Sequence, residues 1–299
     1  MTTNANAASP SLTMLHMATG CWVSQAIHIA AKLGIADLLQ EGGVKTSDAL
    51  AVATRTHPDA LYRLLRALAS LGVFVEFEDR HFQLTPLAEC LCTNAPGSLR
   101  GFAIMLGGQE HWRAWGEILY SVRTGQPAFD HVFGMNQFQY FADNPEVGRL
   151  FNEAMTSRSA QENDAIISAY DFSGFGTLVD VGGGLGTLLE SILQATVNTL
   201  GVLFDMPHVI ASARTTVAQT ARCEFREGNF LDAVPSGSDA YVLKKVIHDW
   251  DDDRARSILR NCRRAISSAG RLLLIEPVIP PGNGPSFNKL LDLSCTRFC

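Results

Sequence analysis

The feature that most constrains the fold is the alternation of short apolar runs and helix-like segments from about residue 175 onward. The helix-like segments are 186–195, 207–220 and 251–266. The strand-like runs are TLVDVGGG, TLGVLFDM, CEFREGNF, SDAYVLKK and GRLLLIEP. Strands that alternate with helices form a parallel sheet with helices on both faces. The sequence therefore predicts a Rossmann-like, doubly wound α/β domain over residues 171–299, with ligand contacts at the carboxyl ends of its strands.

The chain before this region shows a different pattern. Residues 10–40 are predicted to be helical and are apolar nearly all round, which favours burial on more than one side and thus packing against a second subunit. Two further helices are expected to begin near Thr46 and Pro58, and an alternating hairpin is expected around Glu78. Two helices followed by a hairpin are typical of a winged helix. We therefore predict a mostly helical, winged-helix-like domain over residues 1–100.

Residues 101–170 are predicted to form a helical linker that carries many interleaved aromatic side chains. Aromatic stripes usually belong to a core, but they can also wall an apolar pocket for a small molecule. Trp112 fits either environment. The region is therefore a candidate substrate pocket.

Composition narrows the class of protein. Of the 299 residues, 46% are hydrophobic and 18% are charged, which fits a globular protein with a large core. The net charge of −6 argues against a nucleic-acid partner, because phosphate binding needs clustered positive charge. No signal peptide and no apolar run long enough to span a bilayer are found, so no membrane partner is expected. Seven scattered cysteines indicate reduced thiols in a cytoplasmic protein without a structural zinc site.

A winged helix also raises the alternative of a ligand-responsive regulator that binds DNA. The charges speak against this alternative, because Glu76, Glu78 and Asp79 on the predicted wing would face phosphates.

A glycine-rich turn follows the first strand of the predicted sheet. Gly182 and Gly184 come directly after it, where glycines allow the backbone to approach a ligand closely. The dinucleotide fingerprint would need a third glycine where Thr187 stands. Asp180 precedes the turn and adds negative charge, which suits a ligand with a cationic end. Asp205 ends the second strand, where a carboxylate can accept hydrogen bonds from a ribose diol.

Several segments together resemble the S-adenosylmethionine-dependent O-methyltransferases of the plant caffeate/hydroxyindole type. They are VDVGGGLG, FDMPHVI, GNF, VLKKVIHDWDDDRARSILRNC and LLLIEPVIP. The resemblance covers most of the chain, including the N-terminal part, which is a dimerisation domain in that family. It implies methyl transfer from S-adenosylmethionine to a hydroxyl of a small aromatic acceptor, with S-adenosylhomocysteine as the product and no metal. It also implies a homodimer formed through the N-terminal helices.

The resemblance assigns cofactor contacts to particular residues. The glycine turn would hold the methionine end of the cofactor, with Asp180 near its ammonium and Asp205 on the ribose. Asn229 stands where the family usually has an aspartate near the adenine, and Lys244 matches a lysine near the cofactor. The residues implied to contact S-adenosylmethionine are Asp180, Gly182, Gly184, Asp205, Asn229, Phe230 and Lys244.

His248 matches the general base of the family, and Glu276 at the end of the fifth strand can hold the second imidazole nitrogen. A phenol has a pKa of about 10 and a histidine one of about 6.5, so proton transfer in water would cost about 5 kcal/mol. A nearby sulfonium and Glu276 would offset this cost. The alternative is that His248 only begins a helix. The neighbouring acids are assigned to the N-terminus of that helix: Asp249, Asp251, Asp252 and Asp253.

Substrate contacts are implied for Phe151, Met155 and Arg158 in the segment FNEAMTSRS. Arg158 stands where some family members have histidine, which suggests an acidic acceptor, although an arginine on a helix more often faces solvent.

The chain ends in NKLLDLSCTRFC, whereas the resemblance implies a further glycine-rich segment with a glutamate, a helix and two last strands. A truncated, non-catalytic relative that dimerises and binds cofactor is therefore an alternative. In that case the fifth strand would lie at an edge of the sheet.

Overall fold

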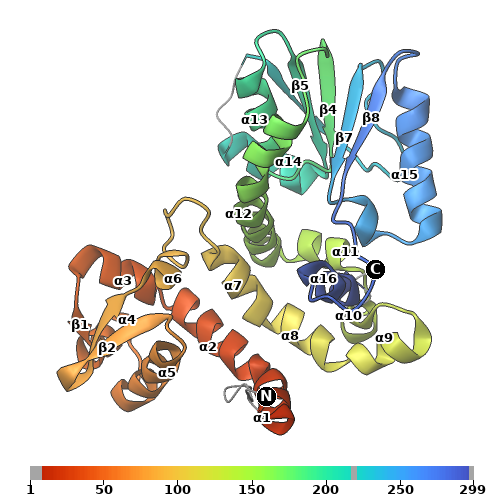
Figure 1. Cartoon of the computed structure of the whole chain (residues 1–299). Helices are drawn as coiled ribbons and strands as arrows, with labels where there is room; N and C mark the ends of the chain where they lie inside the picture. The colour runs from red at the N-terminus through yellow and green to blue at the C-terminus, as the bar shows by residue number, and fades with distance from the viewer. Residues whose placement is uncertain (1–8, 217–220, 296–299) are drawn as a thin grey trace, which may run out of the picture. The chain divides into compact units, whose positions relative to one another are not determined.

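The computed structural model describes residues 9–216 and 221–295, without the side chains of residues 158–161 and 216. The chain divides into two compact units, Met1–His111 and Trp112–Cys299 (Figure 1). Among the described residues, no helix is both long enough and apolar enough to cross a membrane.

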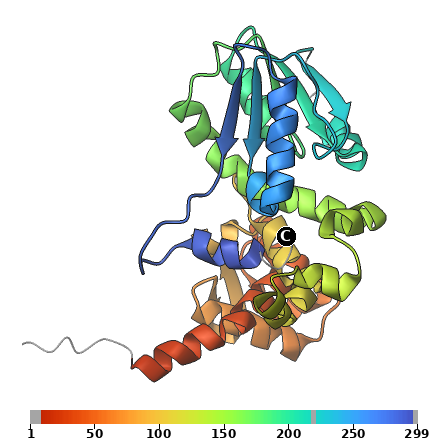
Figure 2. The same ribbon diagram turned by 90° about the vertical axis from the view of Figure 1, so that its right-hand side faces the viewer.

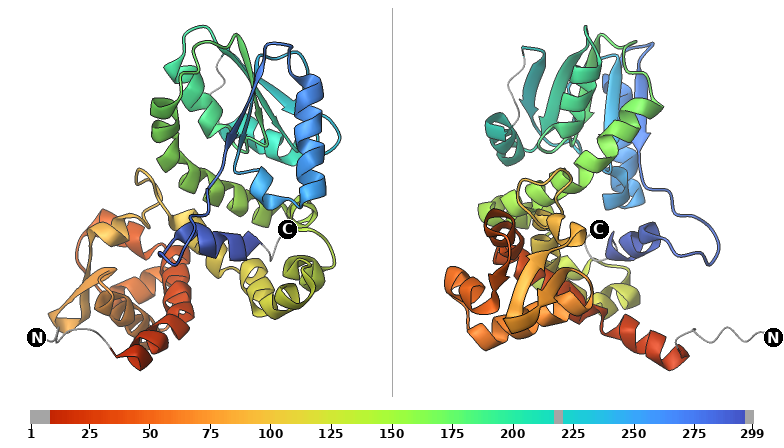
Figure 3. Two further views of the ribbon diagram at one scale, coloured as in Figure 1. Left: turned by 45° about the vertical axis from the view of Figure 1, so that its right-hand side comes forward. Right: turned by 60° about the vertical axis from the view of Figure 1, so that its left-hand side comes forward.

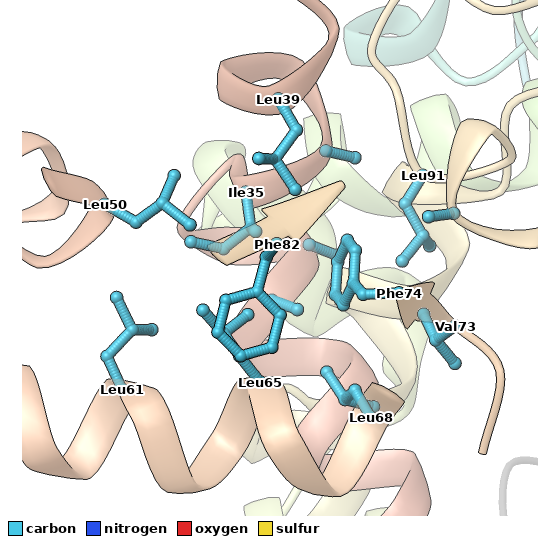
Figure 4. Close-up of a cluster of buried hydrophobic side chains, with 14 of the residues drawn as sticks. Ile35, Leu39, Leu50, Leu61, Leu65, Leu68, Val73, Phe74, Phe82 and Leu91 are labelled. Carbon is cyan, nitrogen blue, oxygen red and sulfur yellow. The ribbon is translucent and has the colours of Figure 1, made fainter. Parts of the chain in front are cut away.

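The first unit is mostly helical and contains a small antiparallel sheet with the strand order β1-β3-β2. Its elements are α1 (Pro10–Ala18), α2 (Gly20–Lys32), α3 (Ile35–Gly42), β1 (Lys45–Thr46), α4 (Ser47–Thr54), α5 (Pro58–Ser70), β2 (Phe74–Phe77), η1 (Glu78–Arg80), β3 (His81–Leu84), α6 (Pro86–Glu89) and α7 (Arg100–Gly107). The core gathers side chains from α3, α4, α5 and the hairpin, with Leu65, Phe74 and Phe82 fully buried (Figure 4). The winged-helix-like prediction is confirmed.

The continuous helix predicted over residues 10–40 is wrong in detail, because the segment forms three helices. α1 ends before Thr19, and Gly34 adopts a left-handed backbone with φ +67° between α2 and α3. Glycine reaches this conformation without the steric cost that other residues bear. Within this chain α1 buries no residue, and Met17 and Trp22 are 71% and 72% exposed.

The second unit begins with helices and continues into the predicted sheet. Its helical part comprises α8 (Gln109–Gly116, which crosses the division between the units), α9 (Ile118–Thr124), α10 (Ala128–Phe133), α11 (Gln137–Asp143) and α12 (Pro145–Ala169). The elements that follow are β4 (Thr177–Val181), α13 (Thr187–Ala195), β5 (Leu200–Asp205), α14 (Pro207–Thr216), β6 (Cys223–Glu227), β7 (Ala240–Lys244), η2 (Ile247–Asp249), α15 (Asp252–Ala265), β8 (Arg271–Ile275) and α16 (Phe287–Cys295).

The five strands of this unit are parallel and lie in the order β6-β5-β4-β7-β8. Leu178 packs on the face covered by α12, α13 and α14, whereas Val179 and Val181 pack on the face covered by α15 (Figure 2). The Rossmann-like, doubly wound fold is therefore confirmed. The chain order reverses between β4 and β7, which is the point where such sheets bind ligands.

β8 lies at one edge of the described sheet, as expected from the sequence, and pairs only with β7 in the part of the chain that the structure describes. Its Leu274 is 49% exposed. Below the carboxyl ends of β7 and β8, α16 packs against η2 (Figure 3).

Candidate active site

A cavity of about 380 Å³ lies at the carboxyl ends of the strands in the second unit. Its walls come from the turn after β4, the ends of β5 and β7, the start of α15, and the helices α11 and α12. Its size is in the range of small-molecule sites. The predicted cofactor residues that line it are Asp180, Gly182, Gly184, Asp205, Asn229, Phe230 and Lys244.

The glycine turn is shaped around Asp180. Gly182 and Gly184 have φ values of +69° and +59°, which favour glycine. A Cβ on Gly183 would lie 2.6 Å from the carboxyl carbon of Asp180, so a larger residue there would displace the carboxylate. The N–H of Gly184 donates to Oδ2 of Asp205 at 2.9 Å, and the N–H of Met206 donates to Oδ1 at 2.7 Å. These two bonds hold Asp205 in place at the rim.

Asp180 is a buried carboxyl group in the wall of the cavity. It is 1% exposed, and its Oδ2 has no hydrogen-bond partner among the described residues. Burial raises the pKa of this carboxyl from 3.8 to about 7; the ammonium of Lys244 opposes the shift and the charge of Asp205 adds to it. A buried carboxylate oxygen without a partner is costly in the free protein, and a cationic ligand group would satisfy it.

Lys244 is held from α12. Its Nζ donates to Oδ1 of Asn163 at 2.7 Å and lies 3.9 Å from Oε2 of Glu162. Burial lowers the pKa of this ammonium from 10.5 to about 8, against the raising effect of the Glu162 carboxylate. Lys245, whose backbone has φ +55°, forms an ion pair with Oε1 of Glu162 at 2.6 Å. The two lysines and Glu162 thus connect β7 to α12.

An aromatic cluster in the wall of the cavity was only partly predicted. The ring of Trp250 stacks on Phe138, with centroids 5.4 Å apart, and meets Phe230 edge to face at 5.7 Å. Trp250 lies in the segment VLKKVIHDWDDDRARSILRNC and Phe138 in the aromatic-rich linker of residues 101–170, but no sequence pattern paired them. Oδ1 of Asn229 accepts the N–H of Leu231 at 2.9 Å, so this amide oxygen also caps the local turn.

His248 and Glu276 contact each other, although neither lines the cavity. Nδ1 of His248 donates to Oε2 of Glu276 at 2.6 Å, and Oε1 of Glu276 accepts the N–H groups of Val246 and Ile247 at 3.1 and 2.8 Å. Burial lowers the pKa of the imidazole. The hydrogen bond to Glu276 and the charges of Asp249 and Glu276 outweigh this effect and leave the pKa raised above 6.5. This arrangement directs Nε2 away from Glu276.

The assignment of Asp249 to the helix start is wrong. α15 begins at Asp252, with Asp251 as its N-cap residue, so only the later acids stabilise its first turn. Asp249 lies in η2, lines the cavity, and places Oδ1 3.4 Å from Nε2 of His248. The four closely spaced aspartates in the sequence did not show which of them cap the helix and which lies at the cavity.

The predicted substrate residues separate into three groups. Phe151 and Met155 line the cavity, together with Phe138 and Phe141. Trp112 is 40% exposed and is not part of the cavity wall. The side chain of Arg158 lies outside the described residues.

This geometry can be compared with known proteins. The model of the O-methyltransferase dimerisation domain matches residues 15–94, and that of the O-methyltransferase domain matches residues 115–295. A phenazine O-methyltransferase, PhzM of Lysobacter antibioticus, is 45% identical over 98% of this chain and 87% of its own length. The crystal structure of LaPhzM has a TM-score of 0.93 and 44% identity, covering 97% of this chain and 88% of that one.

A further solved structure holds ligands. It is NcsB1, an O-methyltransferase from neocarzinostatin biosynthesis, in complex with S-adenosylmethionine and 2-hydroxy-5-methyl naphthoic acid. It has a TM-score of 0.79 and 31% identity, covering 92% of this chain and 84% of that one. These findings support methyl transfer and give no support to a regulator or a non-catalytic relative. The chain belongs to the S-adenosylmethionine-dependent O-methyltransferases, with a dimerisation domain ahead of its methyltransferase domain.

Proposed function

We propose that the protein methylates a hydroxyl of a planar aromatic acceptor, that His248 is the general base, and that Glu276 positions it. The observation that carries this proposal is the short hydrogen bond between His248 Nδ1 and Glu276, next to a cavity that is lined by Asp180, whose buried Oδ2 has no hydrogen-bond partner among the described residues. Calorimetry with S-adenosylmethionine, followed by turnover on a panel of phenols, tests it. Absence of both binding and turnover would contradict it.

The cavity fits S-adenosylmethionine on the chemistry of its own residues. The unbonded oxygen of Asp180 suits an ammonium. A Cβ on Gly184 would meet nothing within 4 Å, so the backbone of the turn is open to a ligand there. Asp205 would hold the ribose, and Phe230 and Asn229 would contact the adenine. When bound, the cofactor supplies an electrophilic methyl group on a sulfonium.

His248 would accept the acceptor's hydroxyl proton on Nε2, because Nδ1–H is already donated to Glu276. As the proton arrives, the imidazolium is stabilised by a carboxylate that two backbone N–H groups hold fixed. The raised pKa of His248 narrows the gap to a phenol, which is about 5 kcal/mol for the ordinary groups in water. Positioning of the phenolate for in-line attack contributes much of the remaining rate.

The acceptor class follows from the cavity walls and the relatives. Phe138, Phe141, Phe151 and Met155 present apolar surface, which suits a flat ring system. The phenazine and naphthoic acid in the names of similar proteins support a fused aromatic acceptor.

Replacing Asp205 with alanine is expected to weaken S-adenosylmethionine binding by about 1–3 kcal/mol, because charge-assisted hydrogen bonds are lost. Calorimetry measures the change. Asp239→Ala is the matched control, because Asp239 also accepts two backbone N–H groups, from Gly176 and Thr177, but at the amino end of β4. The control should lose stability and keep its cofactor affinity. If both variants bind S-adenosylmethionine equally well, Asp205 does not contact the cofactor.

Replacing Glu276 with glutamine is expected to move the acid limb of the kcat/KM profile to lower pH. Neutral imidazole is the active form, so the rate rises with pH through the raised pKa of His248, and the carboxylate is one cause of that rise. We also expect kcat to fall by at least about tenfold. Glu276→Asp, which keeps the charge, should restore the position of the limb. An unmoved limb in Glu276→Gln would contradict the positioning role.

The dimerisation domain supports a homodimer, which we propose to form through the exposed apolar faces of α1 and α2. Trp22→Asp is expected to shift the chain toward monomer, because Trp22 is 72% exposed and a charge is costly at a buried interface. Light scattering after size exclusion measures the mass. Val52→Asp on α4, at a site 79% exposed, should leave the mass unchanged. If Trp22→Asp stays dimeric, as Val52→Asp should, the proposed interface is wrong.

A further inference from the structure

A thiol lies beside the proposed base. Cys295 ends α16, which packs against η2, and η2 carries His248 and Asp249. The donor atoms of the three side chains, an imidazole nitrogen, a carboxylate oxygen and a thiol sulfur, all lie within 4.8 Å of one another. All three residues are partly buried.

These distances are close to those of a tetrahedral zinc site. Zinc bonds of about 2.0–2.3 Å at tetrahedral angles separate neighbouring donor atoms by about 3.4–3.6 Å. Nε2 of His248 and Oδ1 of Asp249 already lie 3.4 Å apart. The sulfur of Cys295 therefore needs to approach by about 1.3 Å at most, within the reach of a side-chain adjustment at the end of a helix.

The surroundings of His248 also match those of a metal ligand. Ligating histidines usually donate their other ring N–H to a carboxylate, which fixes the tautomer and raises the basicity of the ligating nitrogen. Glu276 receives the Nδ1–H bond at 2.6 Å and is itself held by two backbone N–H groups. A donor set of thiolate, imidazole and one carboxylate favours zinc over magnesium or calcium.

We propose that His248, Asp249 and Cys295 form an inhibitory site for Zn²⁺ or another thiophilic divalent cation. On binding, a sulfur–metal bond replaces the S–H bond of Cys295, whose proton passes to water, and Nε2 of His248 donates its lone pair to the metal. With this lone pair bound to the cation, His248 can no longer accept a proton and the enzyme is inhibited. This consequence rests on the proposed role of His248 as the general base. A fourth position would be filled by water or by the acceptor's hydroxyl.

Co²⁺ added to the full chain tests the site directly, because cobalt bound to a thiolate absorbs strongly in the near ultraviolet. The wild type and the exposed-thiol control Cys90→Ser should show this band, and Cys295→Ser should lose it. In turnover assays, Zn²⁺ should inhibit the wild type, and EDTA should reverse the inhibition. The half-inhibitory concentration, measured against each variant's own metal-free rate, should rise about tenfold or more in Cys295→Ser.

A second measurement needs no variant. Zn²⁺ should slow the alkylation of Cys295 in the wild type, followed by peptide mass spectrometry, and leave that of Cys90 unchanged. A cobalt band that survives in Cys295→Ser, or alkylation of Cys295 that Zn²⁺ does not slow, would overturn the site. A Cys295-dependent band without inhibition would support the metal site and contradict the base role of His248, so the two proposals can fail separately.

Discussion

Replacing His248 with alanine is expected to lower kcat by about 10²–10⁴ while the affinity for S-adenosylmethionine stays nearly unchanged. The variant removes the only group proposed to take the hydroxyl proton, so a neutral phenol would have to attack the methyl group. Cofactor contacts should survive, because His248 does not line the cavity that holds Asp180 and Asp205. Single-turnover kinetics and calorimetry measure the two quantities separately.

His81→Ala is the matched control for this variant. His81 begins β3 in the first unit and its Nδ1 lies 3.0 Å from the carbonyl of Glu78, so its loss removes an imidazole that does not line the cavity. We expect kcat to remain within about twofold of the wild type. A parallel loss of kcat and cofactor affinity in His248→Ala would mean that the residue is structural.

The parts of the site that the sequence predicts are those fixed by strand geometry. Asp180, Asp205 and Glu276 lie at or beside the ends of parallel strands, and these ends meet at one edge of the sheet. Because β7 pairs with β8 in register from Ala240 to Lys244, His248 and Glu276 are brought together by an arrangement that short apolar runs already indicate. Hydrophobic periodicity and strand order therefore suffice to predict that these side chains gather at one edge of the sheet.

The parts that the sequence does not predict depend on contacts between distant helices and loops. Phe138 on α11 stacks on Trp250 across more than a hundred residues, and Asn163 on α12 reaches Lys244. Asp249 could not be separated from the neighbouring acids, because capping depends on which residue begins the helix. Cys295 gave no signal at all, since its place beside His248 follows from the packing of α16.

The break of the first helical segment has a similar cause. Apolar residues continue through residues 10–40, so the hydrophobic pattern alone favours one helix. Gly20 and Gly34 were the available signals, but an isolated glycine inside a helical pattern is also tolerated, at a cost of about 1 kcal/mol. The choice is made by packing, because α2 and α3 bury different residues in the same core.

The second large effect concerns Asp180, where binding and stability should change in opposite directions. Asp180→Asn is expected to weaken S-adenosylmethionine binding by about 3–5 kcal/mol, more than a hundredfold in Kd, because the cofactor's ammonium would lose its buried partner. The same change should raise the melting temperature of the free protein at pH 8, because a carboxylate with one unbonded oxygen no longer has to be buried.

The pH dependence follows from the raised pKa of Asp180. As pH rises from 3.8 to about 7, the unfolded chain loses a proton that the folded chain retains, so the wild type loses stability across this window and the loss is complete above it. The shift of about three units sets an upper limit of about 4 kcal/mol. A buried amide has its own desolvation cost, so we expect a gain of about 1–3 kcal/mol at pH 8 that fades toward pH 4.

Cofactor affinity should follow the same titration with the opposite sign. The ionised carboxylate binds the ammonium, so the Kd of the wild type should tighten as pH rises to about 7 and then level off, whereas Asp180→Asn should show no such step. Asp239→Asn is the matched control, because Oδ2 of Asp239 already accepts two backbone N–H groups. It should melt lower than the wild type and bind cofactor as tightly. If Asp180→Asn instead melts lower at pH 8 and keeps its affinity, Asp180 is a structural carboxylate and the ammonium is held elsewhere.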